Sequence, residues 1–302
     1  MKKLHGVTVA MVTPFDTDGG VDVAALRTLT NALVEKGVDC LYPCGTTGEM
    51  LRLTVEERKL VAETVVQAAA GRVTVFIHVG SMRQDDTIAL ARHAQEIGAD
   101  GIGVVTPQFF TVNDREMEAY FVAVARSVPG FLMYLYNIPQ CAANDLKPEV
   151  VARVCAQCDN VVGIKYSFAD MARTLQYIAV KDGFSVLHGM DKLLVSLLDM
   201  GCEGTVSGCA GVVPEPYVAC MKAYRAGDME AARRWGRVCV RVTDILRGGS
   251  NMSFFKEAIT ARGLKGGVMR APQLDIPADE RDAMIADLKQ ALADAGIAFE
   301  LA

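Results

Sequence analysis

The residues with the clearest chemical potential lie in one short stretch, Val-Val-Gly-Ile-Lys-Tyr at positions 161–166. The stretch is apolar and rich in β-forming residues, which predicts a buried strand. Period-two alternation puts Val161, Gly163 and Lys165 on one face of this strand. A lysine at a strand end either extends to water, its usual environment, or enters a cavity. In a cavity, loss of water favours the uncharged amine, which can form a Schiff base with a carbonyl group.

Two further stretches carry groups that can bind a substrate or transfer a proton. Residues 45–49, Gly-Thr-Thr-Gly-Glu, form a predicted turn whose hydroxyl and backbone N–H groups can hold a carboxylate. Taken alone, this pattern also fits a tight turn with a helix cap. Tyr136, which ends a predicted strand and begins the sequence Tyr-Asn-Ile-Pro, is either a general acid–base or a packed aromatic side chain.

The elements that must position these groups alternate regularly between strand and helix. Eight such units predict a parallel sheet closed as a (β/α)₈ barrel, whose chemistry lies at the carboxyl ends of its strands. An open doubly wound sheet usually carries a Gly-rich turn after its first strand, and Thr-Pro-Phe-Asp at 13–16 is not one. The predicted strands are 7–12, 40–43, 73–79, 101–105, 131–136, 161–165, 185–188 and 204–206. The predicted helices are 22–37, 54–70, 84–97, 114–127, 148–156, 170–180, 192–199 and one from Pro214.

The end of the chain follows a different pattern, because only helices are predicted there. They cover 228–246, 252–262 and 279–295, with Gly-rich breaks at 248–249 and 266–267. We therefore predict a barrel domain of residues 1–226 and a C-terminal helical extension of residues 227–302.

Composition excludes several classes of partner and location. A net charge of −5 gives no basic surface for nucleic acid or an anionic membrane. No uncharged stretch reaches the roughly 18 residues that span a bilayer, and the first residues do not form a secretory signal. Nine cysteines, an odd number scattered through apolar segments, favour the reducing cytoplasm. The pair Cys155 and Cys158 fits helix packing better than redox chemistry.

Three motifs in order, Gly-Thr-Thr-Gly-Glu (45–49), Tyr-Asn-Ile-Pro (136–139) and Gly-Ile-Lys (163–165), give the chain a family resemblance. The sequence resembles the N-acetylneuraminate lyase and dihydrodipicolinate synthase family over essentially its whole length, the helical extension included. Each motif is weak alone, but the three fall at the ends of predicted strands two, five and six, which makes the combination specific.

The resemblance implies a metal-independent class I aldolase that needs no cofactor, because the substrate is activated as a covalent imine on Lys165. It implies that Thr46 and Thr47 hold the carboxylate of pyruvate or another 2-oxo acid, with help from the Val206 backbone. Tyr136 is expected to move protons to and from the substrate hydroxyl, with Thr47 as the relay. A homotetramer acting on small molecules is also implied, and Phe109 and Phe110 are candidates for its interface.

Departures from the family pattern bear on the substrate. Dihydrodipicolinate synthase has an arginine where this chain has Cys141, and a tyrosine that crosses the subunit interface where it has Phe109. A usual Thr-Gly pair has become Ala-Ala at 142–143. These changes disfavour dihydrodipicolinate synthase proper, which remains an alternative. A second alternative is a non-catalytic sensor that binds 2-oxo acids on the same barrel, since the fold alone does not fix the function.

The sugar-acid branch of the family, typified by N-acetylneuraminate lyase, fits the remaining positions better. Ser167, Asp191 and Ser207 resemble positions that bind the polyol tail there, and we count Gly189 among the substrate-binding residues. Lys192 replaces a glutamate of that enzyme, so it either receives an acidic substrate group or is a solvated charge.

One alternative comes from a different reaction class. His78, His188, Glu49 and Asp191 could meet at the barrel mouth as ligands of a metal-dependent aldolase. The small number of histidines and the absence of a His-x-His pattern argue against it. His188 is equally consistent with a substrate contact and with a packed imidazole.

Overall fold

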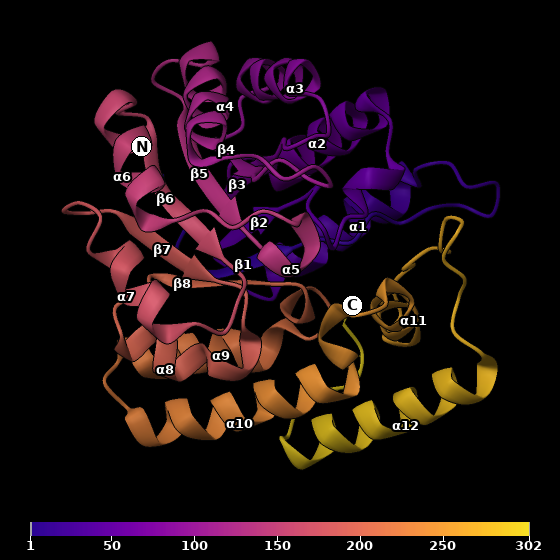
Figure 1. Ribbon diagram of the computed structural model, residues 1–302. Coiled ribbons are helices and arrows are strands. Elements are labelled where there is room, and N and C mark those ends of the chain that lie inside the picture. Colours follow the sequence, from indigo (N-terminus) through magenta and orange to yellow (C-terminus); the bar gives the residue numbers. More distant parts are fainter. Residues whose placement is uncertain (1, 302) are drawn as a thin grey trace.

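The centre of the protein is a closed barrel of parallel strands, seen in a computed structural model that describes residues 2–301 (Figure 1). Each strand pairs with the next along the chain, and β1 also pairs with β8, which closes the barrel and confirms the predicted (β/α)₈ fold. The strands are β1 (Gly6–Ala10), β2 (Cys40–Tyr42), β3 (Thr74–His78), β4 (Gly101–Val105), β5 (Leu132–Asn137), β6 (Val161–Tyr166), β7 (Ser185–His188) and β8 (Gly204–Ser207).

Helices follow the strands and cover the outside of the barrel, as the sequence predicts (Figure 1). They are α1 (Val23–Glu35), α2 (Val55–Ala69), α3 (Gln84–Glu96), α4 (Asp114–Ser127), α6 (Pro148–Gln157), α7 (Met171–Ile178), α8 (Leu194–Asp199) and α9 (Pro214–Arg225). The starts of α1 and α2 are capped by side chains. The Asp22 carboxylate accepts a hydrogen bond from the Ala25 N–H, and Thr54 and Glu57 exchange the two bonds of a capping box.

Five short helical turns in residues 2–301 are not predicted from the sequence, except that one of them overlaps the predicted helix 192–199. They are α5 (Pro139–Ala142) and the 3₁₀ turns η1 (Met50–Arg52), η2 (Asp191–Leu193), η3 (Cys209–Gly211) and η4 (Arg247–Gly249). Segments of three or four residues are too short to show a helical period in the sequence. Four of these turns, α5 and η1–η3, follow strand ends, so they shape the loops that surround the barrel mouth.

The strand that carries Lys165 departs from simple alternation near its start. Met133 of β5 pairs with Val161, but Tyr134 pairs with Gly163, so Val162 is the extra residue of a β-bulge. As a result, Val161 packs in the core between barrel and helices, whereas Val162 packs against the cluster inside the barrel. The prediction that Val161 shares a face with Lys165 is therefore wrong.

The inside of the barrel is filled by large side chains from alternate strand positions. Tyr42 is completely buried there and reaches across to β4. A Cβ atom at Gly103 would lie 1.6 Å from the Tyr42 hydroxyl oxygen, so only glycine leaves room for this ring. The filled interior forms a floor beneath the carboxyl ends of the strands.

The C-terminal extension consists of α10 (Met229–Ile245), α11 (Met252–Ala261) and α12 (Ala278–Asp294). The last helix runs beside α10, and α10 packs against α9 of the barrel (Figure 1). The helices confirm the all-helical pattern of the tail, while the division at residues 226 and 227 stays a prediction.

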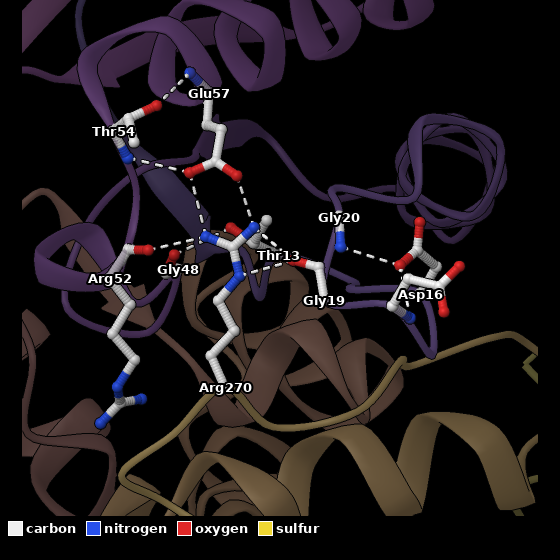
Figure 2. Close-up of polar contacts among 10 residues, drawn as sticks. Thr13, Asp16, Gly19, Gly20, Gly48, Arg52, Thr54, Glu57 and Arg270 are labelled. Atoms are coloured by element: carbon white, nitrogen blue, oxygen red, sulfur yellow. Dashed lines mark hydrogen bonds and ion pairs between the residues drawn. The ribbon is translucent and has the colours of Figure 1, made fainter.

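The segment between α11 and α12, residues 262–277, crosses back to the barrel, and we call it the connecting strap. Figure 2 shows its anchor, Arg270. The Arg270 guanidinium donates to the Gly19 carbonyl (2.8 Å), to the Arg52 carbonyl (2.7 Å) and to both oxygens of Glu57 (3.0 and 2.5 Å). It also lies 4.0 Å from the centre of the Phe15 ring. One side chain thus joins the strap to the loops after β1 and β2.

Replacing Arg270 by lysine is expected to lower the free energy of unfolding by about 1–3 kcal/mol, because lysine keeps the charge but cannot form this fork of bonds. Urea unfolding followed by circular dichroism measures the change. Arg281→Lys is the matched control, since within residues 2–301 the Arg281 side chain pairs only with the neighbouring, exposed Asp282. Equal midpoint shifts in the two variants would show that the fork does not stabilise the fold.

Candidate active site

A cavity of about 310 Å³ opens at the carboxyl ends of the strands. This is the end at which enzymes of this architecture carry out their chemistry. The sequence predicts nine catalytic or substrate-binding residues, and eight of them line the cavity: Thr46, Thr47, Tyr136, Lys165, Ser167, Gly189, Asp191 and Val206. The structure thus brings together residues from strands two, five, six, seven and eight.

Lys165 ends β6 inside this cavity with only 6% of the residue exposed. Its Nζ atom lies 4.2 Å from the centre of the Tyr136 ring and 5.5 Å from that of Tyr42. A Cβ atom at Gly189 would lie 2.1 Å from the Ser167 hydroxyl oxygen and 3.5 Å from Cε of Lys165. Glycine at 189 therefore keeps the space beside the lysine open, and the amine faces the cavity rather than bulk water.

The turn that carries Thr46 and Thr47 connects β2 to η1. A residue from the loop after β1 stabilises this turn, since the Thr13 hydroxyl donates a hydrogen bond of 2.8 Å to the Gly48 carbonyl. The Thr46 and Tyr136 hydroxyl oxygens lie 3.5 Å apart. Hydroxyl groups from two different strands thus meet beside the amine, an arrangement suited to holding a small oxyacid and passing protons to it.

A buried ion-pair network lies behind this turn, and no local sequence pattern predicts it. Glu49, which has a left-handed backbone conformation with φ of 59°, places Oε1 2.6 Å from Lys256 Nζ and Oε2 2.6 Å from Arg52 Nη1. The side chains of Glu49 and Lys256 are each 1% exposed. Burial lowers the pKa of Lys256, and the adjacent Glu49 carboxylate opposes this effect. The network joins α11 of the extension to the turn with the two threonines.

Replacing Lys256 by methionine is expected to lower the free energy of unfolding by about 1–3 kcal/mol, because Glu49 loses one of its two cations and the Val268 carbonyl loses its donor. The urea midpoint measures this loss. The double variant Lys256→Met with Glu49→Gln should recover part of it, since no carboxylate is then left buried. If the double variant is no more stable than the single one, charge compensation is not the cause.

The ends of β7 and β8 supply a carboxylate to the cavity. Asp191 accepts a hydrogen bond of 2.8 Å from the Ser207 hydroxyl, and burial raises the pKa of Asp191. Ser207 does not line the cavity. Ser207 lies behind Asp191, and its hydroxyl oxygen also accepts a hydrogen bond from the Ala210 N–H. Its hydroxyl group therefore holds the Asp191 carboxylate in position.

His188 and Lys192, for which the sequence allowed either a substrate contact or a structural role, lie outside the cavity. The His188 ring faces away from it, with Nε2 3.2 Å from the Thr174 hydroxyl and the ring packed edge-on against Tyr166. Burial lowers the pKa of His188 to about 4, so the packed imidazole is uncharged at neutral pH. Lys192 pairs with Asp244 and lines a separate surface cavity beside α10.

The structure adds residues that the sequence analysis missed. Gly248, Gly249, Ser250, Met252 and Phe255 of the extension form one wall of the cavity. The Gly-Gly-Ser break between two predicted helices was the available signal, but it was interpreted only as a break. The extension is therefore part of the site.

Metal ligation has little support from the arrangement of side chains. Within residues 2–301, no three His, Cys, Asp or Glu side chains are grouped so that they could hold a metal ion. His78 is engaged with the Cys44 carbonyl through Nδ1 at 2.9 Å, and Glu49 with its two cations. The same part of the chain contains no helix with the length and apolar character needed to cross a bilayer.

Comparison with known proteins gives a consistent result. A model of the dihydrodipicolinate synthetase family matches residues 3–291. The chain is 37% identical over 292 residues to a 4-hydroxy-tetrahydrodipicolinate synthase of Hyphomonas neptunium, covering 96% of this chain and 98% of that protein. It is 36% identical over 236 residues to a probable 2-dehydro-3-deoxy-D-pentonate aldolase of Escherichia coli, covering 77% and 78%.

The similar solved structures include a protein crystallised with a ligand. It is a prophage protein of the dihydrodipicolinic acid synthase family from E. coli, in complex with pyruvate. Its TM-score against this chain is 0.90 at 30% sequence identity, and the match covers 96% of this chain and 99% of that one.

Proposed function

Because this chain belongs to the dihydrodipicolinate synthetase family, a family of lyases, we propose that it is a class I aldolase that joins or cleaves a 2-oxo acid and an aldehyde. The observation that supports this most directly is the position of Lys165. Its Nζ atom lies within the cavity, 4.2 Å from the centre of the Tyr136 ring. A buried amine beside a phenol is the arrangement that imine chemistry requires.

The proposed reaction begins with the uncharged Lys165 amine, which attacks the keto carbon of pyruvate or a related 2-oxo acid. Loss of water gives an imine, which carries a positive charge when protonated on nitrogen. The imine accepts the electron pair released when a C3–H bond breaks, which gives a nucleophilic enamine. That carbon then attacks the aldehyde, and water finally releases the product from the lysine. Cleavage follows the same steps in reverse, and no other cofactor is required.

Tyr136 is the proposed proton carrier, and the Thr46–Thr47 turn is the proposed carboxylate site. The Tyr136 hydroxyl lies beside the Thr46 hydroxyl, so a substrate held by the turn is within reach of the phenol. Thr47 also lines the cavity and can relay the proton, and Val206 borders the same space. Together these residues offer a path for one proton to and from the bound substrate.

For the aldol adduct, we propose a sugar acid, as in N-acetylneuraminate lyase or the similar pentonate aldolase, so the aldehyde partner is a sugar or another polyhydroxylated aldehyde. Ser167, Gly189 and Asp191 line the part of the cavity formed by β6 and β7 and offer polar contacts to hydroxyl groups. Dihydrodipicolinate synthase activity is the second candidate, supported by the relative from Hyphomonas neptunium. The cavity wall argues against this activity, because Cys141 occupies the position at which dihydrodipicolinate synthase has an arginine.

The test is incubation with pyruvate and borohydride, followed by intact-mass spectrometry and peptide mapping. The proposal expects a reduced pyruvate adduct on Lys165, formed equally well in the presence of a chelator. An adduct elsewhere, or none, overturns the imine mechanism. An adduct without turnover of any aldehyde in a screen would instead favour a sensor of 2-oxo acids.

The proposal includes a homo-oligomer, a tetramer by family analogy, that works in the cytoplasm. Phe109 and Phe110 are 75% and 71% exposed and stack edge to face, which supports their assignment to an interface between copies. All nine cysteines are unpaired thiols, which supports a reducing compartment.

A further inference from the structure

A second cavity of about 320 Å³ adjoins the catalytic one, and we call it the distal cavity. Thr46, Cys141, Gly249, Ser250 and Met252 line both cavities. The rest of the distal wall comes from residues 49–52 and Gln273. Because the two cavities share this border, a substrate that is too long for the first can extend past Thr46 and Cys141 into the second.

In residues 2–301, two charged residues line the distal cavity, Glu49 and Arg52. The Glu49 carboxylate is shared between two cations, Lys256 and Arg52. The side chains of Glu49 and Lys256 are each 1% exposed, whereas the side chain of Arg52 is 23% exposed. The charge that the cavity wall presents to a ligand is therefore the Arg52 guanidinium.

Arg52 has hydrogen-bonding capacity left over and a fixed backbone. Within residues 2–301, its side chain donates only from Nη1 to Glu49, out of the five N–H groups of a guanidinium. Its carbonyl accepts from Arg270, which anchors the main chain (Figure 2). The side chain extends away from that anchor in the same view. A rigidly based guanidinium with free donors is well suited to a carboxylate or a phosphate.

A second polar group faces the same space. The amide of Gln273, on the connecting strap, lines the distal cavity, and its Oε1 atom is buried without a hydrogen-bond partner in the part of the chain that the structure describes. Buried polar atoms are normally paired, so an unpaired amide indicates that a polar partner is missing. An amide can present either its oxygen or its NH₂ group to that partner.

We propose that the distal cavity binds an anionic group, a carboxylate or a phosphate, at the far end of the aldehyde substrate, and that Arg52 is the residue that selects for it. This inference rests on the proposed aldolase function. In this proposal Arg52, and not Lys192, receives the acidic group of the substrate. The Lys192 ammonium pairs with Asp244 and lies outside both cavities. The chain therefore recognises an acidic aldehyde from the strand-two side of the mouth.

The experiment compares aldehydes that differ only in charge, each with pyruvate as the partner. Succinic semialdehyde against butanal tests a carboxylate, and glyceraldehyde 3-phosphate against glyceraldehyde tests a phosphate. We expect kcat/KM to favour the anionic member of at least one pair by about 10- to 100-fold, the range of a charge-assisted hydrogen bond. The pair that shows the preference identifies the group.

Arg52→Met should remove this preference, and Arg52→Lys should restore it in part, because lysine keeps the charge without the fork. Each ratio is taken within one variant, so a loss of stability cancels. Lys192→Met is the matched control and should leave the ratio unchanged.

Borohydride trapping of pyruvate in the unmodified protein distinguishes a failure of the proposed aldolase function from a failure of the anion site alone. If no adduct forms on Lys165, the proposed function falls and this inference falls with it. If the adduct forms but neither pair shows a preference, or Arg52→Met keeps it, only the anion site is overturned.

Discussion

Replacing Lys165 by alanine is expected to abolish the borohydride-trapped pyruvate adduct and to reduce kcat by at least about 10³-fold, because no other group can form the imine. The fold should survive this change. Lys165 forms no ion pair in residues 2–301, and its Nζ atom lies over the rings of Tyr42 and Tyr136. Urea unfolding should therefore give a midpoint close to that of the unmodified protein.

The control for this prediction is Lys192→Ala, which removes a lysine from the same end of the barrel but outside the cavity. That variant should retain the adduct and the turnover. A Lys165→Ala protein that still turns over substrate would exclude an imine mechanism at this residue, since alanine cannot form a covalent intermediate.

Replacing Tyr136 by phenylalanine should separate imine formation from proton transfer. The ring remains, so the environment of the Lys165 amine 4.2 Å away is preserved and pyruvate should still be trapped. The lost hydroxyl is the one beside Thr46, and its removal is expected to lower kcat by about 10²–10⁴-fold, the usual contribution of a general acid–base. Single-turnover kinetics would then show a fast imine step and a slow later step.

Tyr120→Phe is the matched control. The Tyr120 hydroxyl bonds to Thr87 among the outer helices, so its loss touches no part of the cavity. Equal and small effects of the two substitutions would show that the Tyr136 phenol is a packing group rather than a proton carrier.

Much of the barrel could be predicted from local pattern. The predicted helix starts at residues 54 and 148 depend on neighbouring residues only, and the structure confirms them, with Thr54 as the cap of α2 and Pro148 as the first residue of α6. The position of Lys165 also followed from its place at the end of an apolar strand, because parallel strands end at a common rim. Such features are encoded within a few residues of where they appear.

Other features depend on contacts that no local pattern contains. The bulge at Val162 arises from the register between β5 and β6, so alternation within one strand could not reveal it. The ion pair of Glu49 with Lys256 joins residues that lie far apart in the sequence. The direction of His188 depends on its packing against Thr174 and Tyr166, and a one-position change on a strand reverses such a direction.

The wall that the extension contributes has a consequence for translation. A nascent chain that has emerged through residue 226 already holds Lys165, Tyr136 and Thr46, but it lacks Ser250, Phe255 and the other extension residues of the wall. Because domains are made from the N-terminus onward, the Lys165 amine is present before the walls around it are complete. The cavity is therefore completed late in synthesis, once Arg270 has been added and can join the strap to the loops after β1 and β2.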